Sequence, residues 1–359
     1  MSYWPETQLT LECFPHVPEH VSMPWDAADS FLSRQLDRHA ETLIINDRHG
    51  ALACSFKQHQ SWCDSACAIS ARINNLQNNF PADVFQAACT DSSNIDWTLI
   101  KQVAIKIPKN FEQLKYWLHH CQNNLPDNTP IYLAGMAKHI PVSWLNWLET
   151  HCGQYHQSLI EKKARLLTLT ELGIPEPKDS GYRNDTLKLN ATPGVFSGNK
   201  LDIGSRVILP YLTVIDQGTV CDLGCGNGLL GLSIKQNQPH CRVIATDDSY
   251  VATQSAMSNA ETNQLDIEVR HGNCLAAVSE QLDWVVCNPP YHDGHKELTN
   301  IAINMFRESQ QRLSKDGQML IVANRHLPYQ KELTRLFKHV DSIHKDNKFT
   351  VFHCKIPKR

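Results

Sequence analysis

The chain has 359 residues, of which 42% are hydrophobic and 20% charged, values typical of a globular protein long enough for two domains. Its net charge of −3 at pH 7 does not indicate a strongly basic nucleic-acid-binding protein. No basic segment followed by an apolar run opens the sequence, and no apolar stretch approaches roughly 18 residues. We therefore expect no signal peptide, no membrane span and a cytoplasmic protein.

The 13 cysteines are scattered along the chain, and in a protein without a secretory signal they are expected to be free thiols. Cys63 and Cys67 have the same spacing as Cys221 and Cys225, but no Cys/His pair at zinc-finger spacing completes either set. We therefore predict that the protein has no metal site.

Three apolar runs in the first half predict strands of an α/β domain, at residues 42–47, 103–107 and 131–137. Residues 171–181 are polar and interrupted by glycine and proline, which is typical of a linker. We accordingly divide the chain into a domain at 1–170, a linker at 171–190 and a domain at 191–359.

In the second half, the strand-like run 219–223 leads into a glycine-rich turn and then into a helical stretch. Such a turn lets a ligand approach the backbone closely. Residues 226–231 match the dinucleotide fingerprint G-x-G-x-x-G, which is a weak signal when it stands alone. The longer pattern D-x-G-x-G-x-G instead resembles the first motif of S-adenosylmethionine (SAM)-dependent methyltransferases, and it comprises Asp222, Gly224, Gly226 and Gly228.

Two further strand ends carry polar residues that suit a nucleoside. The run 241–246 ends at Asp247, whose carboxylate can accept both ribose hydroxyls of NAD or of SAM. The neighbouring Asp248 suits the start of the following helix, where the helix dipole favours negative charge. After the run 267–270, Asn273 holds the place where many methyltransferases contact the adenine amino group, although an ordinary turn asparagine explains it nearly as well.

The apolar run 284–287 ends in Asn288-Pro289-Pro290-Tyr291. Proline has no N–H, so this stiff loop offers carbonyl and amide oxygens as acceptors beside an aromatic ring. That combination suits recognition of a planar NH2 group and the ring that carries it, and an ordinary proline turn is the alternative. A dehydrogenase would not need such a loop, so methyl transfer is favoured over hydride transfer.

The rest of the chain alternates between helical and apolar stretches, which predicts a doubly wound sheet. Residues 340–344 and 349–354 predict two strands joined by a turn short enough to make an antiparallel hairpin at the sheet edge. Residues 310–359 carry 11 basic and 4 acidic side chains, and this region includes Lys345 and Lys348, which could contact phosphates.

The first half looks like an altered copy of the second half. Its run 42–47 is followed by Arg48-His49-Gly50, which keeps a single glycine, and its run 103–110 lacks the Asn-Pro-Pro-Tyr motif. We therefore predict an α/β protein with tandem duplicated Rossmann-like SAM-dependent methyltransferase domains, of which the N-terminal copy is degenerate. Two α/β domains that share only a general pattern are the alternative.

Four segments together resemble the bacterial ribosomal RNA guanine-N2 methyltransferases, namely 193–197, 201–205, 222–228 and 288–294. The resemblance implies that the C-terminal domain binds SAM and methylates the exocyclic N2 amine of a guanine. It implies catalytic roles for Asn288, Pro289 and Tyr291. It also implies cofactor contacts for seven residues, Asp222, Gly224, Gly226, Gly228, Asp247, Asn273 and Asn288.

The same resemblance implies substrate contacts by Phe196 and Asp202, and the basic C-terminal region adds Lys345 and Lys348 as candidate phosphate contacts. The terminal hairpin at 347–352 is more similar to the large-subunit branch of this family. We therefore expect a monomeric enzyme of ribosome biogenesis that acts on 23S ribosomal RNA, naked or in an early particle. Other outcomes stay open: a 16S guanine, a nucleic-acid adenine, a protein glutamine, an NAD-dependent oxidoreductase, or a non-catalytic RNA-binding protein.

Overall fold

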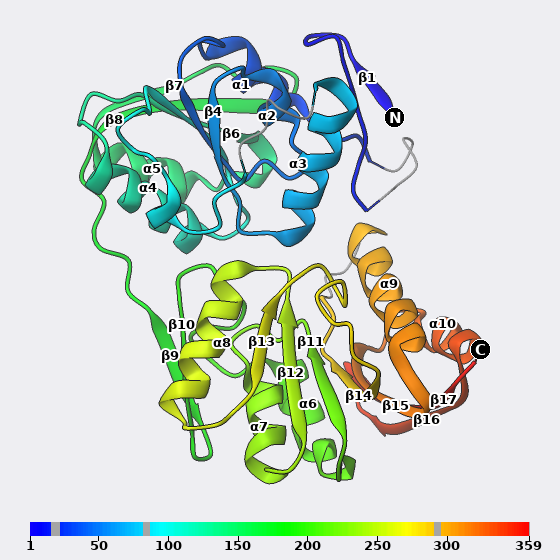
Figure 1. Ribbon diagram of the computed structural model, residues 1–359. Coiled ribbons are helices and arrows are strands. Elements are labelled where there is room, and N and C mark those ends of the chain that lie inside the picture. The colour runs from blue at the N-terminus through cyan, green and yellow to red at the C-terminus, as the bar shows by residue number, and fades with distance from the viewer. Residues whose placement is uncertain (16–21, 82–86, 291–295, 359) are drawn as a thin grey trace. The chain divides into compact units, whose positions relative to one another are not determined.

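The structure, a computed structural model, describes residues 1–15, 22–81, 87–290 and 296–358 (Figure 1). The chain divides into two compact units, Met1–Lys178 and Asp179–Arg359. Within the described ranges, no helix combines the length and the apolar character needed to cross a membrane. The cysteines are free thiols.

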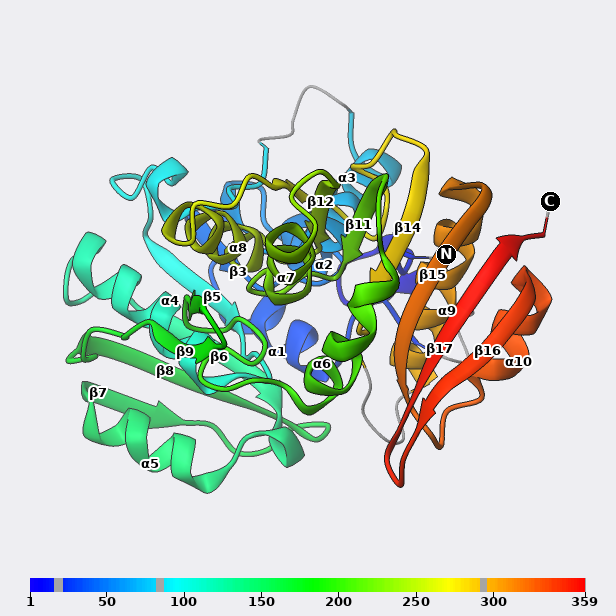
Figure 2. The ribbon, with the colours of Figure 1, turned by 90° about the horizontal axis from the view of Figure 1, so that it is seen from below.

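The C-terminal unit is built on a seven-stranded sheet in the order β13-β12-β11-β14-β15-β17-β16 (Figures 1 and 2). The first five of these strands are parallel, and β17 runs antiparallel to both β15 and β16. The predicted antiparallel hairpin at the sheet edge is thereby confirmed. The strands are β11 (Thr219–Leu223), β12 (Arg242–Asp247), β13 (Glu268–His271), β14 (Leu282–Cys287), β15 (Leu313–Asn324), β16 (Phe337–Lys345) and β17 (Phe349–Pro357).

Helices cover both faces of this sheet, which explains why its inner strands are apolar without interruption. Neighbouring residues of β11 point to opposite faces: Val220 belongs to the core under α6 and α7, and Cys221 belongs to the core under α9 and α10. The helices are α6 (Ile203–Ile208), α7 (Leu229–Asn237), α8 (Tyr250–Thr262), α9 (Lys296–Arg312) and α10 (Tyr329–Leu336).

The N-terminal unit has a six-stranded sheet in the order β4-β3-β5-β6-β8-β7. Its strands are β3 (Thr42–Ile45), β4 (His59–Trp62), β5 (Gln102–Lys106), β6 (Ile131–Met136), β7 (Cys152–Gln157) and β8 (Ala164–Leu172). Its helices are α1 (Ala27–Gln35), α2 (Ala51–Ser55), α3 (Ala66–Asn79), α4 (Phe111–Asn124) and α5 (Val142–Thr150).

The two sheets have the same strand order and the same strand directions once β13 is set aside. With β13 set aside, each unit has four parallel strands. The last two strands of each unit form an antiparallel hairpin at the edge of its sheet. Where the C-terminal unit has β13, the N-terminal unit has an isolated parallel bridge between Trp62 and Cys89. This agreement confirms the predicted duplication of a Rossmann-like fold.

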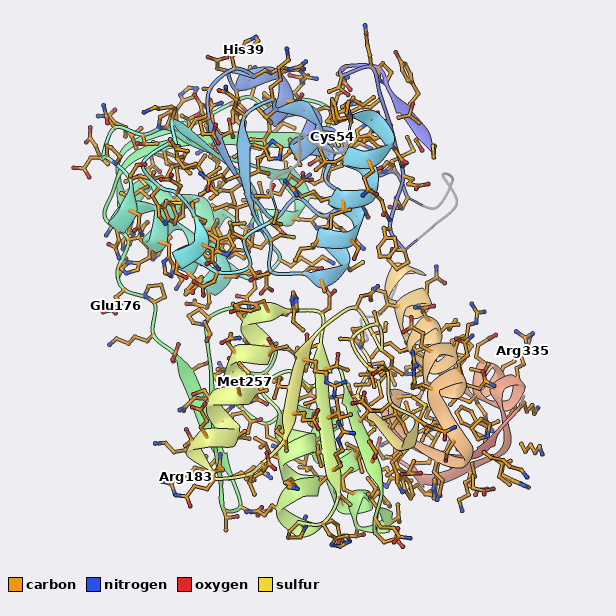
Figure 3. All side chains as sticks on the ribbon, in the orientation of Figure 1. His39, Cys54, Glu176, Arg183, Met257 and Arg335 are labelled. Carbon is orange, nitrogen blue, oxygen red and sulfur yellow. The ribbon has the colours of Figure 1, made fainter. Side chains whose placement is uncertain are left out.

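The duplicated region also includes a small hairpin that precedes each sheet. Residues 180–190, which the sequence analysis assigned to the linker, form β9 (Ser180–Asn184) and most of β10 (Leu187–Ala191). Asn259 of α8 and Asn263, the residue that follows this helix, exchange hydrogen bonds of 2.8–2.9 Å with the backbone of Asn190 and Lys188. The connection between the units is therefore shorter than predicted, and Glu176 lies in it (Figure 3).

The N-terminal unit holds its own hairpin, β1 (Ser2–Trp4) and β2 (Leu9–Leu11), in the same way. Asn75 and Asn79 lie four residues apart on α3 and bond to the backbone of Glu12 and Thr10 at 2.9–3.0 Å. Because four residues make about one helical turn, both amides face the hairpin. The same pair of contacts in both units extends the repeat beyond the sheets.

Lys106 is the last residue of β5, and its side chain forms largely buried ion pairs. Its ammonium group lies 2.6 Å from Asp26 Oδ1 and 2.8 Å from Asp29 Oδ2. Only 14% of the Lys106 side chain and 9% of the Asp29 side chain are exposed. Although burial works against it, the two carboxylates raise the pKa of Lys106, so the lysine stays charged.

We expect Lys106→Met to destabilise the N-terminal unit by about 3 kcal/mol, because it leaves the buried Asp29 carboxylate without its counter-ion. Lys109→Met, at an exposed position, should change stability by no more than about 0.5 kcal/mol. Urea unfolding followed by tryptophan fluorescence reports on this unit, since seven of the eight tryptophans lie within residues 1–178. Equal stability of the two variants would contradict the structural role of the ion pair.

Candidate active site

The residues predicted to bind the cofactor meet at one edge of the C-terminal sheet. In the parallel register, Leu223 of β11 pairs with Thr246 of β12 on one side and with Cys287 of β14 on the other. The loop at 224–228, Asp247 and Asn288 directly follow these three strand ends. They therefore lie side by side, at the carboxyl ends where open α/β sheets bind ligands.

The glycine loop follows a left-handed backbone path at Gly224, Gly226 and Gly228, with φ angles of 77°, 55° and 86°. It is fixed to the neighbouring strand because the amides of residues 224 and 225 both donate to the carbonyl oxygen of Thr246, at 2.8 and 3.0 Å. Residues with a Cβ rarely adopt this conformation, so the glycines are required by the path of the loop.

The space beside the loop differs between two of these glycines. A Cβ added to Gly226 would meet no atom within 4 Å, whereas one added to Gly228 would lie 3.1 Å from the Cβ of Ala256. Gly228 is thus packed against α8, and Gly226 faces open space. A ligand can therefore reach the backbone at Gly226.

Asp222 is a buried carboxylate with one acceptor atom left over. Its side chain is nearly inaccessible, and Oδ2 accepts the backbone N–H of Gly231 at 2.8 Å. Within the described part of the chain, Oδ1 has no hydrogen-bond partner. Burial raises the pKa of Asp222 to about 7. A cationic or hydrogen-bonding ligand group would satisfy this carboxylate.

Asp247 supports the glycine loop. Oδ2 accepts the N–H of Gly226 at 2.8 Å, and Oδ1 accepts the N–H of Ser249 at 2.9 Å. A carboxylate only accepts hydrogen bonds, which is the chemistry that ribose hydroxyls require. Asn273 is half-buried, and its backbone carbonyl accepts the N–H of Ala276 at 3.0 Å.

Asn288 has a fixed side chain. Nδ2 donates to Oδ2 of Asp202 and to Oγ of Ser205, both at 2.9 Å. Oδ1 is buried and has no partner among the described residues. Pro289, which follows, is buried. Tyr291, predicted to stack on the substrate base, lies outside the described residues.

One of the predicted substrate-binding residues contacts Asn288, and the other three are exposed at the surface. The side chain of Asp202 contacts Asn288 and caps α6 through the N–H of Ser205, at 2.9 Å. Phe196 is 59% exposed, and Lys345 and Lys348 are also exposed.

The two lysines lie at the same edge of the sheet as the site. They flank the turn between β16 and β17, and the first residue of β17, Phe349, pairs with Asn324 at the carboxyl end of β15 (Figure 2). Because β15 is parallel to β11 and β14, its carboxyl end lies at the edge that carries the glycine loop.

Three residues of the site were not predicted. Ser205 binds Asn288, Tyr182 accepts a hydrogen bond of 3.3 Å from Asn227 of the glycine loop, and Asn259 donates to the carbonyl of Asn227 at 2.9 Å. The spacing Asp202-x-x-Ser205 is that of a helix cap, which was a usable signal for α6. No local pattern announced the contacts of Tyr182 or Asn259.

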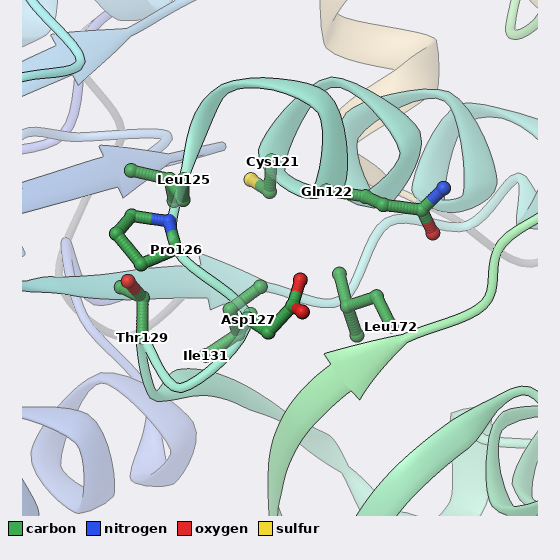
Figure 4. A pocket seen from close by; sticks show the side chains of 8 residues that line it. All are labelled: Cys121, Gln122, Leu125, Pro126, Asp127, Thr129, Ile131 and Leu172. Atoms are coloured by element: carbon green, nitrogen blue, oxygen red, sulfur yellow. The ribbon is translucent and has the colours of Figure 1, made fainter.

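A small pocket lies in the N-terminal unit and is separate from this site (Figure 4). It is found near the amino-terminal end of β6, the edge opposite to that of a ligand site in an α/β sheet. Its lining consists of Cys121, Gln122, Leu125, Pro126, Asp127, Thr129, Ile131 and Leu172.

Each of the two units matches a known protein family. Residues 2–172 match the RLMG N-terminal domain and residues 186–353 match the Methyltransferase small domain. The chain is 31% identical to the ribosomal RNA large subunit methyltransferase G of Shewanella loihica, covering 97% of this chain and 93% of that protein. It is 34% identical to the protein of the same name from Shewanella sp. strain ANA-3, covering 97% of each.

The chain belongs to the family of the ribosomal RNA large subunit methyltransferases G. Among solved structures, the T. thermophilus 16S rRNA N2 methyltransferase in complex with AdoMet and guanosine has the same fold. Its TM-score is 0.78 at 19% identity, covering 98% of this chain and 96% of that chain. Family membership confirms the predicted enzyme class, with SAM as the cofactor, and it overturns the oxidoreductase and non-catalytic alternatives.

We expect Gly226→Ala and Gly228→Ala to separate ligand binding from stability. Both place alanine in a left-handed conformation, at a cost of about 1–2 kcal/mol. Gly228→Ala should lower the melting temperature further, because its Cβ would crowd Ala256. Gly226→Ala should weaken SAM binding in calorimetry more than its stability loss explains, because its Cβ enters the open space. Equal melting temperatures, or unchanged SAM affinity of Gly226→Ala, would contradict this geometry.

Proposed function

We propose that the protein transfers a methyl group from SAM to the exocyclic N2 amine of a guanine in ribosomal RNA of the large subunit. The observation that supports it most is the buried Oδ1 of Asn288 at the carboxyl end of β14, which has no hydrogen-bond partner among the residues that the structure describes. A buried acceptor without a partner costs free energy unless a ligand supplies a donor. The NH2 group of guanine is such a donor.

Asn288 acts on the amine before methyl transfer. The lone pair of the exocyclic nitrogen is delocalised into the ring, so the nitrogen is a weak nucleophile. Asn288 Oδ1 and the Pro289 carbonyl oxygen accept its two N–H hydrogens, which concentrates electron density on the nitrogen and orients its lone pair. No general base is required, because the proton becomes acidic once the methyl group has been transferred.

On the cofactor side, SAM supplies an electrophilic methyl group on its sulfonium. Asp222 neutralises the methionine ammonium group, and Asp247 binds the ribose hydroxyls. The exposed backbone at Gly226 lets the cofactor lie close to the loop, and Asn273 contacts the adenine. Gly224 and Gly228 hold the backbone path of the loop on which the cofactor lies, and Asn288 acts mainly on the substrate amine. Fixing both reactants at adjacent strand ends supplies much of the rate enhancement through alignment.

The RNA contacts follow from exposure and charge. Lys345 and Lys348 lie on the site's edge of the sheet and bind phosphates, and the exposed ring of Phe196 stacks on a base. Tyr291, which lies outside the described residues, keeps its predicted role of stacking on the target guanine. The names of the Shewanella relatives support the large-subunit branch. We propose that a monomer acts in the cytoplasm on naked RNA or an early particle, and that the N-terminal unit contributes to RNA binding.

The function is tested by incubating the protein with labelled SAM and with 23S and 16S RNA from a strain that lacks it. We expect label in 23S RNA, recovered as N2-methylguanosine. Asn288→Ala should reduce turnover by at least about 100-fold, as loss of a key transition-state contact does, while SAM affinity stays within about threefold. Label in 16S RNA, in adenine or in protein glutamine would overturn the substrate, and lost SAM binding would overturn the role of Asn288.

SAM binding should become tighter as pH rises through about 7. Burial raises the pKa of Asp222 to about 7, so below that pH the group is protonated and cannot neutralise the ammonium. From about pH 6 to about pH 7.5, where the cofactor amine stays largely charged, affinity should increase roughly tenfold. Calorimetry at the two pH values measures it. Asp222→Asn should bind weakly at both, and a wild-type affinity independent of pH would exclude this role of Asp222.

A further inference from the structure

We propose that Asp202 and Ser205 are positioning residues that fix the orientation of the Asn288 amide, so that its oxygen faces the substrate amine. This inference rests on the proposed function, in which Asn288 Oδ1 accepts an N–H of the base. It assigns Asp202 to the positioning of Asn288, whereas the sequence analysis predicted that Asp202 contacts the substrate.

An asparagine side chain can rotate by half a turn and exchange its oxygen and nitrogen, and only its hydrogen-bond partners decide between the two states. Both hydrogens of Asn288 Nδ2 have acceptors at 2.9 Å, Oδ2 of Asp202 and Oγ of Ser205. In the reversed state, Oδ1 would face the carboxylate of Asp202, which has no hydrogen to donate. That repulsion leaves one orientation.

The acceptor atoms are themselves held by the start of α6. Asp202 is the N-cap residue, and its Oδ2 also accepts the N–H of Ser205 at 2.9 Å. Ser205 is buried in the first turn of the helix. One carboxylate oxygen therefore joins the helix start to the end of β14, so the acceptors for Asn288 cannot drift independently.

The N-terminal unit contains the same arrangement. Ile105 pairs with Ile45 in β5 and β3 as Cys287 pairs with Leu223 in β14 and β11, so Lys106 holds the place of Asn288. This register makes the comparison independent of any sequence similarity.

Asp26 caps α1 as Asp202 caps α6, and Asp29 stands three residues further on, where Ser205 stands. The Lys106 ammonium bonds to both carboxylates, at 2.6 and 2.8 Å. In both units a donor at the strand end is thus held by the cap residue and by the residue three positions later.

The two donors differ in what they leave for a substrate. Lysine carries hydrogens only, so Lys106 offers no acceptor once its carboxylates are bound. Asparagine gives its two hydrogens to the helix and keeps an oxygen. In the N-terminal unit the contact serves stability alone, whereas in the C-terminal unit it also determines which atom of Asn288 is presented.

The test compares Ser205→Ala, Asp202→Ser and Asp202→Asn in the full chain. Ser205→Ala removes one acceptor and favours the helix. Serine at 202 can still cap α6 but is too short to hold Asn288, whereas asparagine keeps an oxygen for both contacts. We measure kcat and KM for RNA, the dissociation constant of SAM by calorimetry, and the melting temperature.

We expect Ser205→Ala and Asp202→Ser each to lower kcat about tenfold, the factor for one hydrogen bond, with SAM affinity and melting temperature close to wild type. Asp202→Asn should retain most of the activity, because the N–H of Ser205 keeps the amide oxygen at this position turned toward Asn288. Equal activity of Asp202→Ser and Asp202→Asn, or an unchanged kcat of Ser205→Ala, would overturn the inference and leave the proposed function intact. A wild-type protein that binds SAM without methylating RNA would overturn both.

Discussion

The parallel register of β11, β12 and β14 is the constraint on which the rest of the site depends. Parallel strands bring their carboxyl ends to one edge, so three loops that are distant in sequence meet there. The register places the loop at 224–228 between Asp247 and Asn288, and hydrogen bonds from the loop amides to Thr246 and Asp247 fix it. The chemistry then depends on two buried acceptors that have no hydrogen-bond partner within the described ranges, Asp222 Oδ1 and Asn288 Oδ1.

The contacts that the two units share identify the structural framework of the fold. Both units keep the sheet order, the asparagine pair that holds the small hairpin, and the contact from a helix cap to a strand end. These contacts join elements that must pack together in any protein of this topology, so they persist where the N-terminal unit has lost the glycine loop. The framework contacts are thus shared by the two units, which differ at the glycine loop and at the residue in the position of Asn288.

The sequence was sufficient to predict the fold class, the duplication and the convergence of Asp222, Asp247 and Asn288, because strand ends can be recognised locally and parallel topology brings them together. The hairpin at 180–191 was missed, although the alternation of buried Leu187 and Leu189 was a signal, because glycine and proline before it favoured a linker. The contact of Asn288 with Ser205 could not be predicted. It joins residues 83 positions apart, and only the packing of α6 against the sheet brings them together.

The two units also differ in the residue that binds the start of the helix after the first loop. In the C-terminal unit, the amide of Gly231 in the first turn of α7 is bound by Asp222 from the strand, so the loop contributes no carboxylate to the helix start. In the N-terminal unit, the corresponding amide, that of Ala53, is bound by Asp47 from the loop at 2.8 Å. Moving the carboxylate from the strand into the loop satisfies the helix start equally well. Asp47 then stands at the position of Cys225, and Arg48 stands at the position of the ligand-facing Gly226. A change from this arrangement to that of the C-terminal unit would require substitutions in both the strand and the loop.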